Sequence, residues 1–270
     1  MRNSFYILGF LFASLSLFSC EKVIDIEFNE SEALIVIEGE LTDDPSDPQT
    51  ITISKTTDFQ TTNDQLFVSG AVVLITDDDG NSVFLSETSP GKYQTTTLPG
   101  VPGRTYNLTV TYDGKTYTSI CKMPVRTTVD SLSILKSFGF GGVSRSVVPH
   151  FQDPAGKGNY YRARMYINGV FIESFIYDDE FLDGNYNTQG LQSFNQEIRK
   201  FDTVSVQFMN VDKDVHFYFE SLEANSSGPG GGIASPANPK SNIKGGAISI
   251  ESLNREYINF NFDLCSFKNI

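Results

Sequence analysis

The side chains that could do chemistry are few in this 270-residue chain, which contains three cysteines and two histidines, His150 and His216. These numbers are too small for a Cys/His zinc cluster and do not point to a cysteine protease. The sequence contains no Gly-x-Ser-x-Gly elbow, His-Glu-x-x-His helix or phosphate-binding loop. We therefore predict no catalytic residue, no metal and no cofactor, and we expect both histidines to be packed or solvent-exposed. A pair of carboxylates brought together by the fold leaves glycoside hydrolysis open.

Cys20 is the residue for which the sequence predicts a definite modification. An apolar run, Phe5–Phe18, follows Arg2 and is shorter than the roughly 20 residues that span a bilayer. Residues 1–19 are therefore typical of a signal peptide. Leu17-Phe18-Ser19-Cys20 resembles the bacterial lipobox, in which the thiol is acylated, so we predict lipid attachment at Cys20 and a tether over residues 20–32. An ordinary signal peptide with an incidental cysteine is the alternative.

Cys121 and Cys265 remain after Cys20 is acylated. Two cysteines outside the cytoplasm form an even pair that could oxidise. Such a disulfide would join the end of the first predicted domain to the last strand of the chain. Two buried thiols in separate cores are the alternative.

Acidic residues gather in two turns that invite a calcium site. Asp77-Asp78-Asp79 precedes Gly80-Asn81, and Asp178-Asp179-Glu180 lies close to Asp183. The first run lacks the second half and the terminal Glu of an EF-hand loop. We expect both runs to be solvated hairpin ends, with a metal or ligand site as the alternative.

The charge balance narrows the classes of partner. Lys and Arg number 20 against 33 Asp and Glu, which gives a net charge of −13. This balance argues against nucleic acid, and against an anionic membrane surface as the main partner. The chain has no Trp for stacking on glycans, but it has 12 Tyr and 22 Phe. Candidates to contact a ligand or partner are the tyrosines around the Asn168-Gly169 turn: Tyr160, Tyr161, Tyr166 and Tyr177.

The elements that must position these residues are mainly strands. In the segment Tyr106–Tyr112 apolar and polar residues alternate, which is typical of a half-buried strand. Asp79-Gly80 and Asp113-Gly114 should supply the positive φ angles of two-residue hairpin turns. Residues 33–124 contain seven such short strands, and their spacing predicts an immunoglobulin-like sandwich.

A linker over residues 126–130 leads into a second predicted β-rich domain over 131–270. Its strongest signal is a hairpin at Asn168-Gly169, between two alternating runs. One short helix is expected over Asp214–Ala224, with Asp214 as its cap. The Gly- and Pro-rich residues 225–246 should form a long loop, and loops of this length are commonly functional. Its candidate contacts with a partner are Gly230, Gly231 and Asn242.

Four segments together resemble one protein family. They are Leu-Ile-Val-Ile-Glu-Gly at 34–39, Ser-Gly-Ala-Val-Val-Leu-Ile at 69–75, Gly-Lys-Tyr at 91–93 and Gly-Arg-Thr-Tyr-Asn-Leu-Thr-Val at 103–110. Their order and spacing after a lipobox are similar to those of the Bacteroidetes outer-membrane lipoproteins called domain of unknown function 4249. Residues 217–223 and 242–247 are similar to the end of that family.

The resemblance implies an accessory lipoprotein that acts beside a TonB-dependent outer-membrane transporter, with no catalytic residue to carry over. In such lipoproteins, acidic residues after the lipidated cysteine resemble a signal for export to the outer leaflet. We therefore expect a lipid anchor in the outer membrane with the body at the cell surface; the periplasmic face is the alternative. The expected function is binding in nutrient uptake. A glycan-binding or adhesive lipoprotein is the second hypothesis, and a hydrolase is the third.

Overall fold

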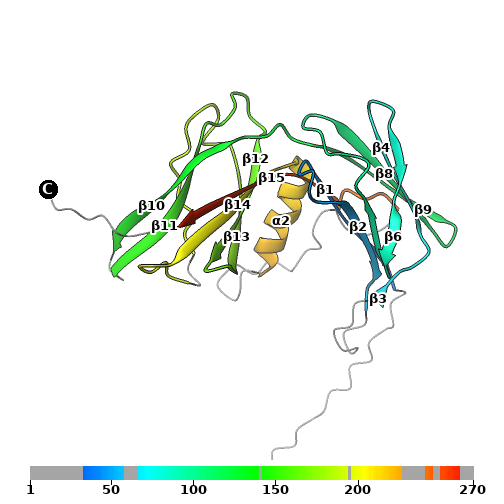
Figure 1. Ribbon diagram of the computed structural model, residues 1–270, viewed down its shortest axis with the longest axis horizontal. Helices are drawn as coiled ribbons and strands as arrows, with labels where there is room; N and C mark the ends of the chain where they lie inside the picture. Colours follow the sequence, from blue (N-terminus) through cyan, green and yellow to red (C-terminus); the bar gives the residue numbers. More distant parts are fainter. Residues whose placement is uncertain are drawn as a thin grey trace, which may run out of the picture. The chain divides into compact units, whose positions relative to one another are not determined.

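Strands dominate the computed structural model of the chain (Figure 1), which describes residues 33–57, 66–139, 142–193, 196–226, 241–245 and 250–261. Several predicted features lie outside the described residues: the leader, Cys20, the tether, Gly230, Gly231 and Cys265. The predictions that concern them stay predictions. Residues 33–270 form one compact unit. Among the described residues, no helix is both long and apolar enough to cross a membrane.

The mainly β fold class is confirmed, with a single helix in the described part of the chain. The strands are β1 Ile35–Thr42, β2 Gln49–Lys55, β3 Leu66–Phe67, β4 Val72–Asp77, β5 Ser82–Phe84, β6 Ser86–Ser89, β7 Lys92–Thr95, β8 Thr105–Tyr112, β9 Lys115–Lys122, β10 Val129–Gly139, β11 Gly142–Phe151, β12 Tyr160–Ile167, β13 Val170–Asp178, β14 Thr203–Val211 and β15 Ile250–Asn261; the helix is α2 Lys213–Ser226. The two short strands β3 and β6 add to the seven predicted over residues 33–124.

These strands form three sheets. The largest has the order β13-β12-β14-β15-β1-β2-β7-β6, with β3 paired to β2, and the others are β5-β4-β8-β9 and β10-β11. Two large apolar clusters form the core. One gathers side chains from β1, β2, β4, β7, β8 and β9, and the other gathers them from β10 to β14. The immunoglobulin-like topology predicted for residues 33–124 stays a prediction.

The last described strand joins the two halves of the chain. β15 pairs in parallel with β1, from Gly39↔Ile250 to Thr42↔Leu253, and antiparallel with β14 along the rest of its length. The two clusters lie on either side of the predicted linker, but Ile243 of the second half packs into the first cluster. The large sheet therefore continues across the predicted division at 124–131, and the division into two domains stays a prediction.

Two of the three predicted hairpin turns have the expected backbone. Asp113 and Asn168 have φ angles of 49° and 52°, and each is followed by a glycine with positive φ. The turn at Asp79-Gly80 differs, because only Gly80 has a positive φ, of 88°. The Gly80 N–H donates to the Asp77 carbonyl at 3.2 Å, so the turn is one residue longer than predicted.

The helix is confirmed, but its cap is not the predicted Asp214. α2 begins one residue earlier, and Asp212 accepts a hydrogen bond from the Val215 N–H at 2.9 Å. This is the bond by which an N-cap carboxylate satisfies a free N–H group of the first turn. Val215 and Phe219 pack on Met209 and Val211 of β14. This packing holds α2 against the large sheet.

Candidate functional site

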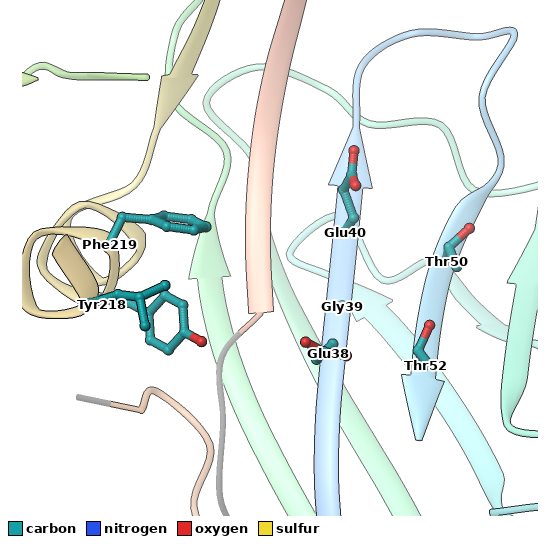
Figure 2. A pocket seen from close by; sticks show the side chains of 8 residues that line it. Glu38, Gly39, Glu40, Thr50, Thr52, Tyr218 and Phe219 are labelled. Atoms are coloured by element: carbon teal, nitrogen blue, oxygen red, sulfur yellow. The ribbon is translucent and has the colours of Figure 1, made fainter. Parts of the chain in front are cut away.

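A groove lies between α2 and the neighbouring part of the large sheet (Figure 2), with a volume of about 380 Å³. Two aromatic rings of α2 line one side, and two carboxylates and two hydroxyls line the other. The lining residues are Glu38, Gly39, Glu40, Thr50, Thr52, Tyr218, Phe219 and Leu222. We call this the α2 groove.

The sheet wall of the α2 groove follows from strand alternation. Ile37 and Leu41 of β1 point into the core, so Glu38 and Glu40 lie on the opposite face. On β2, Thr50 and Thr52 alternate with the buried Ile51 and Ile53. The register sets Glu38 opposite Thr52 and Glu40 opposite Thr50. An outward row of carboxylates and hydroxyls is the result.

The helix wall is held by a cation–π contact. The guanidinium of Arg162 on β12 lies 3.6 Å from the centre of the Phe219 ring. The rings of Tyr218 and Phe219 meet edge to face, with centroids 5.2 Å apart. Rings beside hydroxyls and carboxylates suit a ligand with apolar faces and several hydrogen-bond donors.

A second recess of about 600 Å³ lies beside the same helix and shares Phe219 and Leu222 with the α2 groove. It is lined by Glu173 of β13 and Glu223 of α2 as well as by Arg162. Burial raises the pKa of the Glu223 carboxyl, and the positive charge of Arg162 opposes this. One buried oxygen of Glu173 has no hydrogen-bond partner among the described residues. Polar groups therefore flank α2 on two sides.

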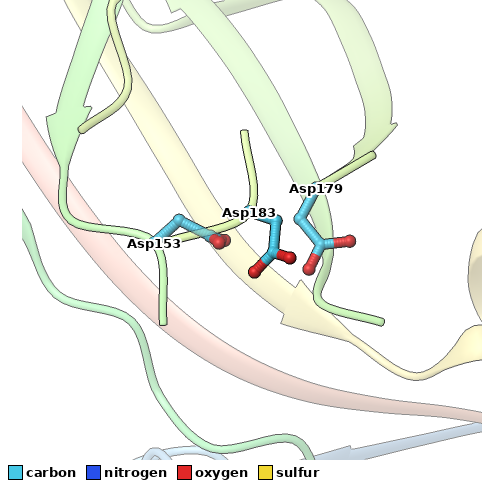
Figure 3. A group of neighbouring side chains, drawn as sticks. All are labelled: Asp153, Asp179 and Asp183. Atoms are coloured by element: carbon cyan, nitrogen blue, oxygen red, sulfur yellow. The ribbon is translucent and has the colours of Figure 1, made fainter. Parts of the chain in front are cut away.

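Three carboxylates converge at another place, in the C-terminal half of the chain (Figure 3). We call this place, which comprises residues 153–160 and 178–187, the acidic end. Ligand oxygens of Asp153, Asp179 and Asp183 lie within 4.8 Å of one another. The first two residues are buried. Three carboxylates are the oxygen donors that calcium and magnesium prefer.

Protein donors already occupy these carboxylates. Asp179 accepts hydrogen bonds of 3.0 to 3.1 Å from the N–H groups of Gly158 and Asn159 and from the Asn159 side chain. Asp153 accepts from the Tyr161 hydroxyl and from the Gly184 N–H. Asp183 accepts from the Gly156 N–H at 2.7 Å. The arrangement fixes two loops to each other, and the prediction that no metal binds here stays a prediction.

The solvated charge run expected at Asp178-Asp179-Glu180 is wrong for its central residue. Asp179 is buried beneath the loop that precedes β12. The sequence interpretation also missed Asp153 as its neighbour. A usable signal was Asp153-Pro154 followed by two closely spaced glycines, because small residues allow backbone N–H groups to approach a carboxylate.

The four predicted tyrosines lie on β12 and β13 and not in loops. Tyr160 and Tyr166 are half-buried on the outward face of β12. Tyr161 is wholly buried against Phe151 and Phe208, and burial raises the pKa of its hydroxyl. Tyr177 packs against the same core. Tyr161 therefore belongs to the core, because strand alternation turns it inward.

The other predicted residues within the described part are separated from the α2 groove. Cys121 is buried in the first apolar cluster, and its pairing with Cys265 stays a prediction. The Asn242 carbonyl accepts a hydrogen bond from the Ser119 hydroxyl, and Lys244 pairs with Thr118. This part of the predicted loop is therefore tied to β9.

His216 is buried in α2, whereas His150 is half-buried and bonded to Ser133 at 2.7 Å. His216 thus packs against Tyr160 within the fold, and His150 forms a side-chain hydrogen bond. The α2 groove uses neither of them.

The fold and the α2 groove together define a mainly β protein with an open, polar and aromatic recess on the face of a large sheet. A family model, the domain of unknown function DUF4249, matches residues 21–247, and the chain belongs to this family. No curated protein matches the chain.

Proposed function

We propose that this chain is a lipid-anchored binding protein of the outer membrane, exposed at the cell surface, which acts with a TonB-dependent transporter in nutrient uptake. The leader and Cys20 support the anchor. The α2 groove is the observation that carries the binding role. Its walls offer rings, hydroxyls and carboxylates at once, which is the chemistry of recognition of a polar ligand.

Binding is favoured over hydrolysis at the α2 groove by the placement of its acids. Glu38 and Glu40 lie on one strand and on one wall of the groove. Glycoside hydrolysis needs two carboxylates that flank the scissile bond, one to protonate the leaving group and one on the other side of the sugar. Both acids lie on one wall, where they can bind hydroxyl or ammonium groups, and the described residues of the helix wall add no carboxylate that faces them.

The test is a mild-detergent pull-down of the tagged full chain from its native outer membrane, with partners identified by mass spectrometry. A Cys20→Ala variant is the control. We expect stoichiometric recovery of a TonB-dependent transporter that is lost in the control. Recovery of the lipoprotein alone would contradict the accessory role.

A glycan-binding or adhesive role is the second candidate, and the two rings of the α2 groove favour it. Tyr218 and Phe219 offer faces on which a sugar ring could stack beside the acceptors of Glu38 and Glu40. The probes are soluble oligosaccharides of glucose, mannose and N-acetylglucosamine, measured by calorimetry. We expect Tyr218→Ala to weaken binding about tenfold. The exposed Phe84 of β5 lies outside the α2 groove, so Phe84→Ala should leave binding unchanged.

A further inference from the structure

Strand register gives the C-terminal half two opposite ends. Tyr160, at the start of β12, pairs with Asp178 at the acidic end, and Ile167, at the end of β12, pairs with Val170. Seven residue steps along a strand separate these pairs by about 23 Å. The same register sets the β10–β11 turn far from Phe151, which precedes the acidic end.

The segments that meet at the end away from the acids, as far as the structure describes them, are residues 136–139, 142–145, 168–171 and 197–203, and we call them the basic end. Arg145 donates hydrogen bonds to the Glu197 carboxylate at 2.8 Å and to the Ile198 carbonyl. The Asn168 N–H donates to the Thr203 carbonyl at 2.8 Å, and its side chain donates to Asp202. These contacts tie three of the segments to one another.

The basic end presents large apolar side chains to solvent. Phe138 is 83% exposed and Phe201 is 73% exposed. Three further exposed side chains come from the starts of β11 and β13: Val143, Val170 and Phe171. Val143 pairs directly with Phe138 across the β10–β11 hairpin. Apolar residues that project from adjoining turns mark an interaction surface rather than a core.

Phe201 adds backbone strain to this exposure. Its φ angle is +72°, in the left-handed region that bulky residues rarely adopt. Glycine or asparagine would occupy this turn at lower cost. A strained phenylalanine whose ring faces solvent points to a role for the ring outside the fold.

The charge of the basic end is opposite to that of the whole chain. Its described segments contain four basic residues and two acidic ones: Lys136, Arg145, Arg199 and Lys200, with Glu197 and Asp202. Lys200 lies 4.7 Å from the centre of the Phe201 ring. Glu197 forms an ion pair with Arg145, and Asp202 accepts the Arg199 N–H. A local positive excess thus stands on a chain with a net charge of −13.

We propose that the basic end inserts into an anionic membrane surface. Phe138 and Phe201 enter the boundary between headgroups and acyl chains, and the basic side chains around them meet lipid phosphates. The negative charge of the remaining surface is repelled from the same membrane, so the contact is restricted to this end. The charge complementarity favours lipid over an apolar protein partner.

This inference goes beyond the binding role and involves no residue of the α2 groove. A lipid at Cys20 would hold the chain at one point only. A second contact at the basic end would fix which face of the C-terminal half is turned away from the membrane. Failure of one proposal would leave the other intact.

The test is sedimentation with vesicles of phosphatidylcholine that contain about one third phosphatidylglycerol. The protein is the chain from residue 21 onward, which includes the whole compact unit 33–270 and lacks the lipidated cysteine. We expect binding to the mixed vesicles, and weaker binding at about 0.5 M salt than at about 0.1 M. Phe138→Ser and Phe201→Ser should each reduce the bound fraction about fivefold or more.

Phe181→Ser is the matched control, because Phe181 is 87% exposed but lies at the acidic end. It should bind like the parent, and thermal unfolding should show that all three variants fold. An absence of vesicle binding by the parent, or an equal loss in Phe181→Ser, would overturn the proposal. The proposal would also be overturned if both basic-end variants still bound the vesicles but no longer recovered a partner protein from the outer membrane.

Discussion

At the acidic end, Asp153 and Asp179 are buried and accept hydrogen bonds from two loops, whereas at the basic end Phe138 and Phe201 project from turns into solvent. Each end also carries an exposed phenylalanine, Phe181 at the acidic end, so the exposure of a ring alone does not separate them. The difference lies in where the charges are used. At the acidic end buried carboxylates fix the backbone of two loops, and at the basic end the charged side chains lie in segments that carry exposed rings, with Lys200 4.7 Å from the centre of the Phe201 ring. The charged residues of the acidic end stabilise the fold, and the basic end offers a surface for contact with a membrane.

The largest expected effect is at Asp179. Asp179→Ala should lower the free energy of unfolding by about 2–4 kcal/mol, because the buried carboxylate is the shared acceptor of the Gly158 and Asn159 N–H groups and of the Asn159 side chain. Urea unfolding followed by circular dichroism measures this loss. A loss below about 1 kcal/mol would mean that the loops of the acidic end do not depend on the carboxylate.

Glu197→Ala is the matched change at the basic end. Its carboxylate is 53% exposed and pairs with Arg145, so its removal should cost at most about 1 kcal/mol.

The addition of calcium tests whether the carboxylates of the acidic end bind a metal. If calcium raised the unfolding midpoint of the parent and not that of Asp179→Ala, the acids would be ligands rather than loop acceptors.

The next effect concerns the core side of the acidic end. Tyr161→Phe removes the hydroxyl that donates to Asp153 and leaves the ring in place against Phe151. We expect a loss of about 1–2 kcal/mol, because a buried carboxylate loses one of its two donors. Urea unfolding checks the value. Tyr186→Phe, which removes an exposed bond to Asp130, should cost less.

Local patterns predicted local structure well in this chain. The turns at Asp113 and Asn168 and the helix over α2 follow from a few adjacent residues whose backbone preferences agree. The parallel pairing of β1 with β15 joins residues more than two hundred positions apart. No local pattern specifies such a pairing, because the alternation of a strand fixes its faces and not its neighbour.

The α2 groove shows the same limit. Alternation predicts that Glu38 and Glu40 share one face of a strand, and helical spacing predicts a face for Phe219. Neither pattern indicates that these faces meet. That contact depends on the packing of α2 on β14, which in turn depends on the pairing of β14 with β15. The sequence likewise does not predict the basic end, because its three turns are distant from one another along the chain.

Substitution of Phe201 tests whether its strained backbone is retained because the exposed ring contacts the membrane. Phe201→Gly should raise the free energy of unfolding by roughly 0.5 kcal/mol, because glycine adopts a φ of +72° without steric conflict and the exposed ring contributes little packing. The same variant should bind vesicles less. Lys200→Gly, at a neighbouring position without positive φ, should instead be slightly destabilising. Destabilisation by Phe201→Gly would show that the ring packs within the fold.

The smallest effect is a pH dependence beside the acidic end, where the His216 ring packs at a tilt against Tyr160 with ring centroids 4.7 Å apart. Burial lowers the pKa of His216, and the negative charges of Glu220 and Asp178 partly oppose this. The unfolded chain therefore takes up a proton near the ordinary pKa of 6.5, before the folded chain does. Stability present at neutral pH is lost as the pH falls below that value.

His216→Phe removes the titrating group while keeping a ring against Tyr160, and the buried Nδ1 has no hydrogen-bond partner among the described residues to be lost. Urea midpoints at about pH 7 and about pH 5.5 should differ less in this variant than in the parent. Vesicle binding through the basic end should depend on His216 at neither pH, because His216 packs against Tyr160, at the opposite end of β12 from Ile167. A shift in vesicle binding with His216→Phe would mean that the two ends are coupled through β12.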